Sequence, residues 1–190
     1  MMRLVVLALG GVILAGGSMA QDVEAGRKVA GMCRTCHGID GYAKIPIAPH
    51  IGGEPADYLE SQLRAFREGS RVNEMMSVVA GGLTDSQITD VAAWYAGHQA
   101  TATLPEAADR ANAPELCVTC HGADGIAVQP GVPNLAGETN IYIDTQLKAF
   151  RLGKRTSDVM SPIAADLTDA EIRAYADWFA AVKLEITGPE

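Results

Sequence analysis

The chain has 190 residues and carries 15 lysines and arginines against 23 aspartates and glutamates, a formal net charge of -8 at pH 7. Proteins that bind nucleic acids usually carry an excess of basic residues, so we expect no nucleic acid among the partners of this acidic chain. An acidic surface either steers docking onto a basic patch of a partner protein or serves only solubility, and composition leaves both roles open.

Residues 1–20 have the features of a secretory signal peptide. Arg3 supplies a positive charge, residues 4–15 form an apolar run, and residues 18–20 (Ser-Met-Ala) make a small-x-small cleavage site. A retained membrane anchor is the alternative, but it needs about 20 apolar residues and this run is shorter. We therefore expect export, with the mature chain beginning at Gln21.

The motif C-x-x-C-H occurs twice, at residues 33–37 and 117–121, and uses all four cysteines of the chain. Two cysteines three residues apart on a helical turn face the same way, so both thiols can add to the two vinyl groups of one porphyrin. The histidine that follows then points its imidazole at the iron. The motifs predict two covalently attached haem c groups, held by Cys33, Cys36 and His37 and by Cys117, Cys120 and His121.

A C-x-x-C pair also occurs in zinc sites and in redox-active dithiols. A zinc site needs four converging ligands and usually pairs its two halves about 15 to 20 residues apart. A redox-active pair would need a thioredoxin-like βαβ pattern around it, and none is visible in the sequence. Haem is the interpretation that we favour.

The sequence contains an internal repeat of two units. When it is shifted by 84 residues, residues 33–96 align without a gap with residues 117–180, and 30 of these 64 positions are identical. Such repetition indicates a duplicated domain, and two units are too few for a solenoid, so each should have its own core. We expect one domain at 21–100, a linker at 101–113 and a second domain at 114–190.

Three helices are expected in each unit, and because no run shows sustained strand alternation the predicted class is all-α. In the first unit the helices cover about 23–33, about 57–69, and the segment from the capping box at 84–87 to about Gly97. Gly26 would allow a second helix to approach the first one closely.

The second unit departs from the first just before its haem motif. Pro114 lies three residues before Cys117, and Arg110 stands where the first unit has Gly26. Since proline is tolerated only in the first turn of a helix, the leading helix of the second unit should start late or be broken.

The second axial ligand decides whether such an iron only exchanges electrons or also binds a substrate. The second unit contains one methionine, Met160, and its counterpart in the repeat is Met76. This shared register favours both as thioether ligands of iron over flexible core packing, the commoner role of methionine. His50 aligns with Asn134, which fits a polar loop residue better than an alternative iron ligand.

A proximal histidine needs its other ring nitrogen held, usually by a backbone carbonyl or a carboxylate. Pro49 and Pro133, each twelve residues after a motif histidine, are candidates to present that carbonyl. Four arginines also repeat in register and would either neutralise haem propionates or lie solvated at helix ends: Arg67, Arg71, Arg151 and Arg155.

Taken together, four motifs resemble the di-haem cytochrome c4 family. They are C-x-x-C-H-G, P-x-[LI]-x-G-E, Y-[LI]-x-x-Q-L-x-A-F-R-x-G-x-R, and a methionine seven residues before Leu-Thr-Asp. The resemblance covers nearly all of residues 22–182 and implies two class I cytochrome c domains related by a pseudo-twofold axis. It also implies the iron ligands and the prolines that orient the two histidines: His37, Met76 and Pro49 in the first domain, and His121, Met160 and Pro133 in the second.

We accordingly expect a periplasmic carrier of single electrons and not an enzyme. The expected partners are redox proteins: a quinol-oxidising cytochrome complex or a dehydrogenase as donor, and a cytochrome c oxidase as acceptor. One rival is an electron-accepting subunit of a sulfide, sulfite or alcohol dehydrogenase. Another is a di-haem enzyme such as a peroxidase, which would need one open iron. Membrane association is expected only through partners or an uncleaved signal segment.

Overall fold

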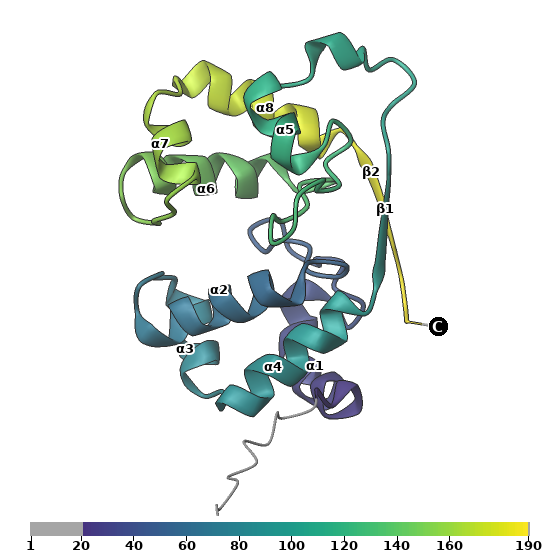
Figure 1. Cartoon of the computed structure of the whole chain (residues 1–190), viewed down its shortest axis with the longest axis vertical. Coiled ribbons are helices and arrows are strands. Elements are labelled where there is room, and N and C mark those ends of the chain that lie inside the picture. The colour runs from purple at the N-terminus through teal and green to yellow at the C-terminus, as the bar shows by residue number, and fades with distance from the viewer. Residues whose placement is uncertain (1–20, 190) are drawn as a thin grey trace, which may run out of the picture.

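The computed structural model describes residues 21–189, so the predicted signal peptide lies outside the described residues. The chain forms two mostly helical halves stacked along the long axis of the molecule, and a two-stranded ribbon runs beside both of them (Figure 1). Between residues 21 and 189, no helix has the length and apolar character needed to cross a membrane.

The first half contains the helices α1 (Val23–His37), α2 (Ala56–Glu68), α3 (Glu74–Gly81) and α4 (Asp85–Ala96). α1 packs on α4, and α2 packs on both α3 and α4. Their buried apolar side chains form one core cluster: Val29, Ala30, Leu59, Leu83, Ile88, Val91, Ala92 and Tyr95.

The second half contains the helices α5 (Glu115–His121), α6 (Asn140–Arg151), α7 (Met160–Ala165) and α8 (Asp169–Ala180). α6 packs on α7 and α8. This half has a core cluster of its own, as the repeat predicts: Ile143, Leu147, Leu167, Ile172, Ala176 and Phe179.

The helix starts predicted from the capping boxes and the helix end predicted at Gly69 are confirmed, but each half has four helices and not three, because the short helices α3 and α7 were not predicted. Thr84 and Thr168 each cap a helix by accepting the N–H of the residue three positions on, and that residue's side chain bonds back to the cap, so both capping boxes form. Gly69 ends α2 with a φ of 80°, in the left-handed region that favours glycine.

The leading helices of the two halves differ in the predicted way. A Cβ atom on Gly26 would lie 2.0 Å from the carbonyl oxygen of Asp90, so α1 and α4 can approach this closely only because residue 26 has no side chain. In the second half, Pro114 precedes α5, which has seven residues against fifteen in α1. Arg110 belongs instead to the short 3-10 helix η1 (Arg110–Asn112).

Two short strands that the sequence pattern did not indicate accompany the helices. β1 (Gln99–Thr103) and β2 (Lys183–Thr187) pair antiparallel, and β1 crosses the expected boundary between the first domain and the linker. A two-stranded ribbon is marginal on its own. Here its inward side chains pack on both halves, since Ile186 lies against Gly52 and Leu184 against Gly137.

The two strands are equivalent segments of the repeat, and each pairs with its own counterpart. The central pair is Thr101 with Glu185, which are the two residues that the 84-residue shift aligns. A segment that pairs antiparallel with its own equivalent lies on a local twofold axis. The halves are therefore related by a pseudo-twofold axis that passes through the ribbon.

Candidate functional site

The two C-x-x-C-H motifs lie in different halves, one at the end of α1 and one in α5. The four cysteines are half-buried, and none of them is in a disulfide. Burial raises the pKa of the Cys33 thiol, and it raises the pKa of Cys117 to about 11. A redox-active pair needs a lowered thiol pKa, which these thiols do not have. A zinc site needs converging ligands, and within residues 21–189 no three His, Cys, Asp or Glu side chains are arranged to hold a metal ion.

Each motif histidine is held by the carbonyl of a proline. His37 Nδ1 donates to the Pro49 oxygen at 2.9 Å, and His121 Nδ1 donates to the Pro133 oxygen at 2.8 Å. Because a carbonyl oxygen can only accept, Nδ1 carries the proton and Nε2 keeps its lone pair. Burial lowers the pKa of both imidazoles, partly offset by the proline carbonyl. Both rings are therefore neutral with Nε2 free, which is the form that binds iron.

The turn that follows each motif is anchored by a tryptophan of the half's last helix. Trp94 Nε1 donates to the carbonyl of Ile39 at 3.0 Å, and Trp178 Nε1 donates to the carbonyl of Ala123 at 3.0 Å. The same bond in both halves fixes the position at which the helix with the C-x-x-C-H motif ends and the loop with Pro49 or Pro133 begins.

Met76 and Met160 lie at the starts of the short helices α3 and α7. The side chain of Asn73 accepts the Met76 N–H at 3.0 Å, and that of Ser157 accepts the Met160 N–H at 3.1 Å. Both methionines are half-buried. The residue before each of them is at least 60% exposed, and these residues are Met75 and Val159.

His50 has both ring nitrogens occupied and lies at the junction of the two halves. Its Nδ1 accepts the Ala43 N–H at 2.9 Å, and its Nε2 donates across the junction to the Gly137 carbonyl at 3.0 Å. Asn134 makes the same pair of bonds in the second half, including one from its Nδ2 to the Gly53 carbonyl at 3.1 Å. His50 is thus a loop residue whose role an asparagine fills in the repeat.

Two buried glutamates at this junction were not singled out by the sequence. Glu54 and Glu138 are 4% and 3% exposed, and each accepts a backbone N–H from the other half. Burial raises the pKa of Glu54 to about 8; burial and then the nearby Glu54 raise that of Glu138 well above its usual range. Glu138 Oε2 has no hydrogen-bond partner. The sequence shows both only as the last residue of a loop motif, and helical or strand periodicity gives no sign of partners 80 and 88 residues away.

The four repeated arginines divide into two kinds. Arg67 donates to the Leu83 carbonyl and to Asp85, and Arg151 makes the equivalent two bonds in the second half. This pair ties α2 to α4 and α6 to α8, so its role is structural.

The other two arginines reach across the junction. Arg71 donates to Gln62 at 2.6 Å and to Gln146 of the other half at 2.9 Å. Arg155 donates to Gln146 at 2.8 Å and to Gln62 at 3.1 Å. Each arginine therefore bonds to both glutamines, which repeats the pseudo-twofold relation seen in the ribbon.

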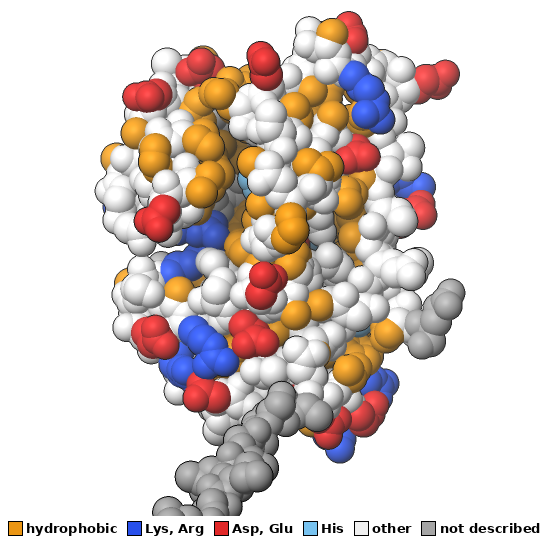
Figure 2. All heavy atoms as spheres, viewed as in Figure 1, with side chains coloured by type: hydrophobic (Ala, Val, Ile, Leu, Met, Phe, Trp, Pro, Cys, Tyr) orange, Lys and Arg blue, Asp and Glu red, His pale blue; other side chains and the backbone are white. Residues whose placement is uncertain are grey.

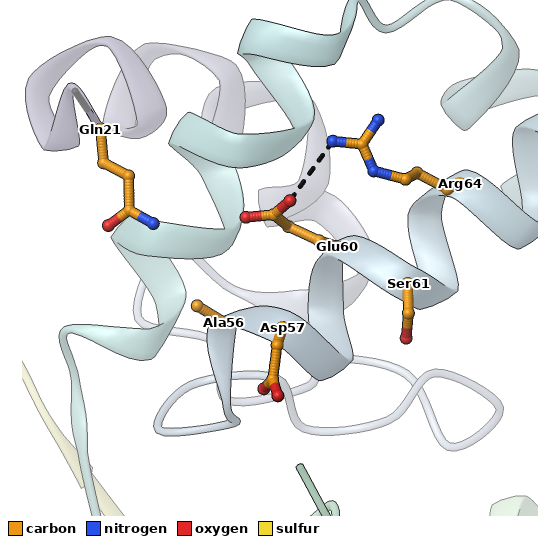
Figure 3. Close-up of a pocket in the computed structure, with 6 residues that line it drawn as sticks. All are labelled: Gln21, Ala56, Asp57, Glu60, Ser61 and Arg64. Atoms are coloured by element: carbon orange, nitrogen blue, oxygen red, sulfur yellow. Dashed lines mark hydrogen bonds and ion pairs between the residues drawn. The ribbon is translucent and has the colours of Figure 1, made fainter. Parts of the chain in front are cut away.

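A surface pocket on the first half lies apart from these groups. It is lined by residues at the start of α2 and by Gln21, with an ion pair between Glu60 and Arg64 at 3.3 Å (Figure 3). None of its lining residues belongs to a C-x-x-C-H motif.

On the face shown in Figure 2, apolar side chains gather around a hollow between α5 and α6 of the second half.

Comparison with known proteins identifies the family. A family model described as cytochrome c matches residues 23–97 and 111–183. The chain is 34% identical over 178 residues to the thiosulfate dehydrogenase electron acceptor of Thiomonas intermedia, which covers 83% of this chain and 82% of that protein. It is 31% identical over 192 residues to a cytochrome c4 of Pseudomonas aeruginosa, which covers 92% of this chain and 94% of that one. The chain belongs to the di-haem cytochrome c4 family.

A solved cytochrome c4 has the same fold. The crystal structure of reduced recombinant cytochrome c4 from Pseudomonas stutzeri matches with a TM-score of 0.74 at 28% identity, and covers 86% of this chain and 100% of that one. The protein is therefore a di-haem c-type cytochrome and an electron carrier, with two covalently bound haem c groups.

The residues of this chain fit those groups. In each half, two half-buried thiols on one helical turn precede a neutral histidine whose Nε2 is free. The thiols of Cys33 and Cys36, and those of Cys117 and Cys120, would hold the porphyrins. A bound haem c supplies an iron that gains or loses one electron without a bond being made in a substrate.

Proposed function

We propose that this protein carries single electrons in the periplasm, from a quinol-oxidising cytochrome complex or a dehydrogenase to a cytochrome c oxidase. The main support is the repetition of one ligand frame in both halves: a neutral histidine with Nε2 free, and a half-buried methionine at the start of a short helix. A site closed on both faces exchanges electrons and leaves no position open for a substrate.

The proposed iron ligands are His37 and Met76 in the first half and His121 and Met160 in the second. Pro49 and Pro133 hold the two imidazoles by their Nδ1–H groups, which keeps Nε2 directed at one place in both oxidation states. Histidine and methionine together raise the reduction potential relative to more basic ligand pairs.

The proposed division of the chain is a signal peptide at 1–20, domains at 21–100 and 114–190, and a linker at 101–113. The separate core clusters of the two halves support it.

Visible spectroscopy of the purified holoprotein tests the ligands. A pyridine haemochrome assay should count two haems per chain, and the ferric protein should show the weak far-red band of an iron–thioether bond. Met76→Ala and Met160→Ala should each remove about half of that band, whereas the exposed control Met75→Ala should keep all of it. A full-strength band in Met160→Ala would refute the ligand assignment in the second half.

The second candidate is a dedicated acceptor for one dehydrogenase. It is favoured by the similarity to the thiosulfate dehydrogenase electron acceptor of Thiomonas intermedia. The two candidates differ in the donor, so the reduction rate of the purified cytochrome should be measured with a quinol-oxidising complex and with a thiosulfate dehydrogenase. Fast reduction by the dehydrogenase alone would select the second candidate.

A further inference from the structure

A continuous hydrogen-bonded path runs from the motif histidine of the first half to a buried carboxyl group of the second. His37 Nδ1 donates to the Pro49 carbonyl at 2.9 Å, and the next residue, His50, donates its backbone N–H to Glu138 Oε1 at 2.8 Å. The Pro49 C=O and the His50 N–H belong to the same peptide group. One amide thus separates the imidazole of His37 from the carboxyl of Glu138.

The second half contains the same path in the opposite direction. His121 Nδ1 donates to the Pro133 carbonyl at 2.8 Å, and the Asn134 N–H donates to both oxygens of Glu54, at 3.1 and 3.0 Å. Each motif histidine therefore ends its hydrogen-bonded path on a glutamate of the other half. The four residues that act in each path are equivalent under the repeat, except that His50 is replaced by Asn134.

An amide transmits charge between its two ends. Negative charge at the N–H end draws the amide toward its dipolar resonance form, which makes the carbonyl oxygen a stronger acceptor. A stronger acceptor pulls the Nδ1 proton of the histidine and makes the imidazole a more electron-donating ligand, and such hydrogen bonds tune a metal through its ligand. The effect is largest where water is excluded, and both glutamates are almost fully buried.

We propose that Glu138 is a positioning and tuning residue for His37 and that Glu54 is one for His121, so that the reduction potential in each half follows the ionisation of a carboxyl group in the other half. The proposal rests on the proposed iron ligation by these two histidines. The junction then does more than hold the two halves together, because it places one ionisable carboxyl group at the end of the hydrogen-bonded path to each motif histidine.

The surroundings allow the two carboxyl groups to change charge. Facing Glu138 are Glu54, the phenol of Tyr142 and the backbone N–H groups of His50 and Thr139. The titratable imidazole of His50 donates to the carbonyl of the adjacent Gly137, and Glu54 receives the Asn134 N–H. Burial favours the protonated form of both, and Glu138 Oε2 has no partner to stabilise its charge. Both groups should therefore ionise at a higher pH than an exposed glutamate does.

The test is the reduction potential of each haem in the holoprotein, measured against pH from about 5 to 10, the range in which raised carboxyl pKa values fall. We expect the potential of the first haem to decrease as Glu138 ionises and that of the second to decrease as Glu54 ionises. Glu138→Gln should abolish the decrease for the first haem and leave that of the second. Glu54→Gln should do the reverse, and it should move the titration of the first haem to lower pH, because the charge of Glu54 no longer opposes ionisation of Glu138.

A second readout separates the hydrogen-bonded path from charge acting through space. In the reduced protein, the NMR signal of the His37 Nδ1 proton should move downfield with the ionisation of Glu138, and it should not titrate in Glu138→Gln. The control Glu106→Gln removes an exposed carboxylate and should leave both potentials and both Nδ1 signals as in the wild type. The wild-type titration needs no variant, so it stands even if a substitution prevents folding.

Equal effects of Glu138→Gln on the two haems, or a His37 Nδ1 signal that ignores the ionisation, would overturn the inference. Failure of the proposed ligand set is recognised separately, because the wild-type protein would then lack the iron–thioether band. A normal band with potentials that do not change with pH would refute the inference alone.

Discussion

At the scale of residues, His50 and Asn134 show that the repeat preserves hydrogen bonds and not side-chain identity. Each accepts one backbone N–H and donates to one carbonyl across the junction. Histidine does this only as the neutral ring with its proton on Nε2, because Nδ1 must accept. The first half therefore contains a group that can gain a proton at a position where the second half has none.

Exchanging His50 for the residue of the other half tests this equivalence. His50→Asn should keep both hydrogen bonds and change the free energy of unfolding by less than about 1 kcal/mol. His50→Ala should cost about 1–2 kcal/mol, because it leaves two half-buried backbone groups, the Ala43 N–H and the Gly137 carbonyl, without their partner. Chemical denaturation of the holoprotein measures both values. A loss in His50→Asn as large as that in His50→Ala would contradict the equivalence.

The same position should make the wild-type protein sensitive to acid. Burial lowers the pKa of His50 in the folded state, so the unfolded chain binds more protons once the pH falls below its ordinary pKa of about 6.5. The contribution of His50 to stability is complete above that pH and is lost as the pH falls toward the lowered pKa. Thermal unfolding at several pH values should show a shallower acid loss in His50→Asn, and an unchanged slope would count against this assignment.

At the scale of elements, the long amphipathic helices could be predicted and the short helices could not. The capping boxes and Gly69 mark the ends of helices in the sequence itself. α3 and α7 have eight and six residues, too few for a helical period to be visible, although they present the proposed ligands Met76 and Met160. The repeat therefore singles out the two proposed ligand residues, whereas the elements that carry them could not be predicted.

Two glycines of α1 make a matched pair for testing its contact with α4. Gly26→Ala would place a Cβ atom against the Asp90 carbonyl and should destabilise the first half by about 1–3 kcal/mol through overpacking. A Cβ atom on Gly31 would have no other atom within 4 Å, so Gly31→Ala should stabilise the helix by about 0.5–1 kcal/mol. Calorimetry of the two variants should give opposite signs, and equal effects would show that the close approach is not limiting.

The cap of α3 should control how firmly Met76 is held. Asn73 accepts the N–H groups of Met75 and Met76, and loss of such a cap costs about 1 kcal/mol. In Asn73→Ala, the iron–thioether band should therefore be lost at a lower temperature than in the wild type. Asn73→Ser retains a capping oxygen and should restore most of the difference, whereas equal behaviour of the two variants would exclude a role for the cap.

At the scale of the whole molecule, the halves are joined by the junction loops and by the ribbon. Residues 49–54 and 133–138 exchange hydrogen bonds, and β2 returns from the second half to lie beside β1 (Figure 1). The ribbon could not be predicted from the sequence, because β1 has only five residues and four of them, at 100–103, are alanines and threonines. Such a segment does not indicate a strand without its partner, which lies 84 residues away.

Deleting β2 tests how much the ribbon contributes to holding the halves together. A chain that ends at Val182 should unfold in two separate calorimetric transitions and show a larger radius of gyration by X-ray scattering, because only the junction loops and the crossing arginines remain. A chain that lacks only residues 188–190 keeps the ribbon and should behave as the full chain does. A single, unchanged transition in the longer truncation would mean that the loops suffice.

The pairing of β1 with its own repeat equivalent also bears on how this molecule came to have two sites that differ. As separate polypeptides, the halves would meet as an isologous homodimer, in which every substitution appears on both faces at once. Fusion into one polypeptide lets each face be encoded independently. A histidine at position 50 can then oppose an asparagine at 134, and a proline can shorten α5 while α1 stays long. Because the two halves are covalently linked, their electron-carrying sites can differ in sequence while the interface between them keeps its pseudo-twofold symmetry.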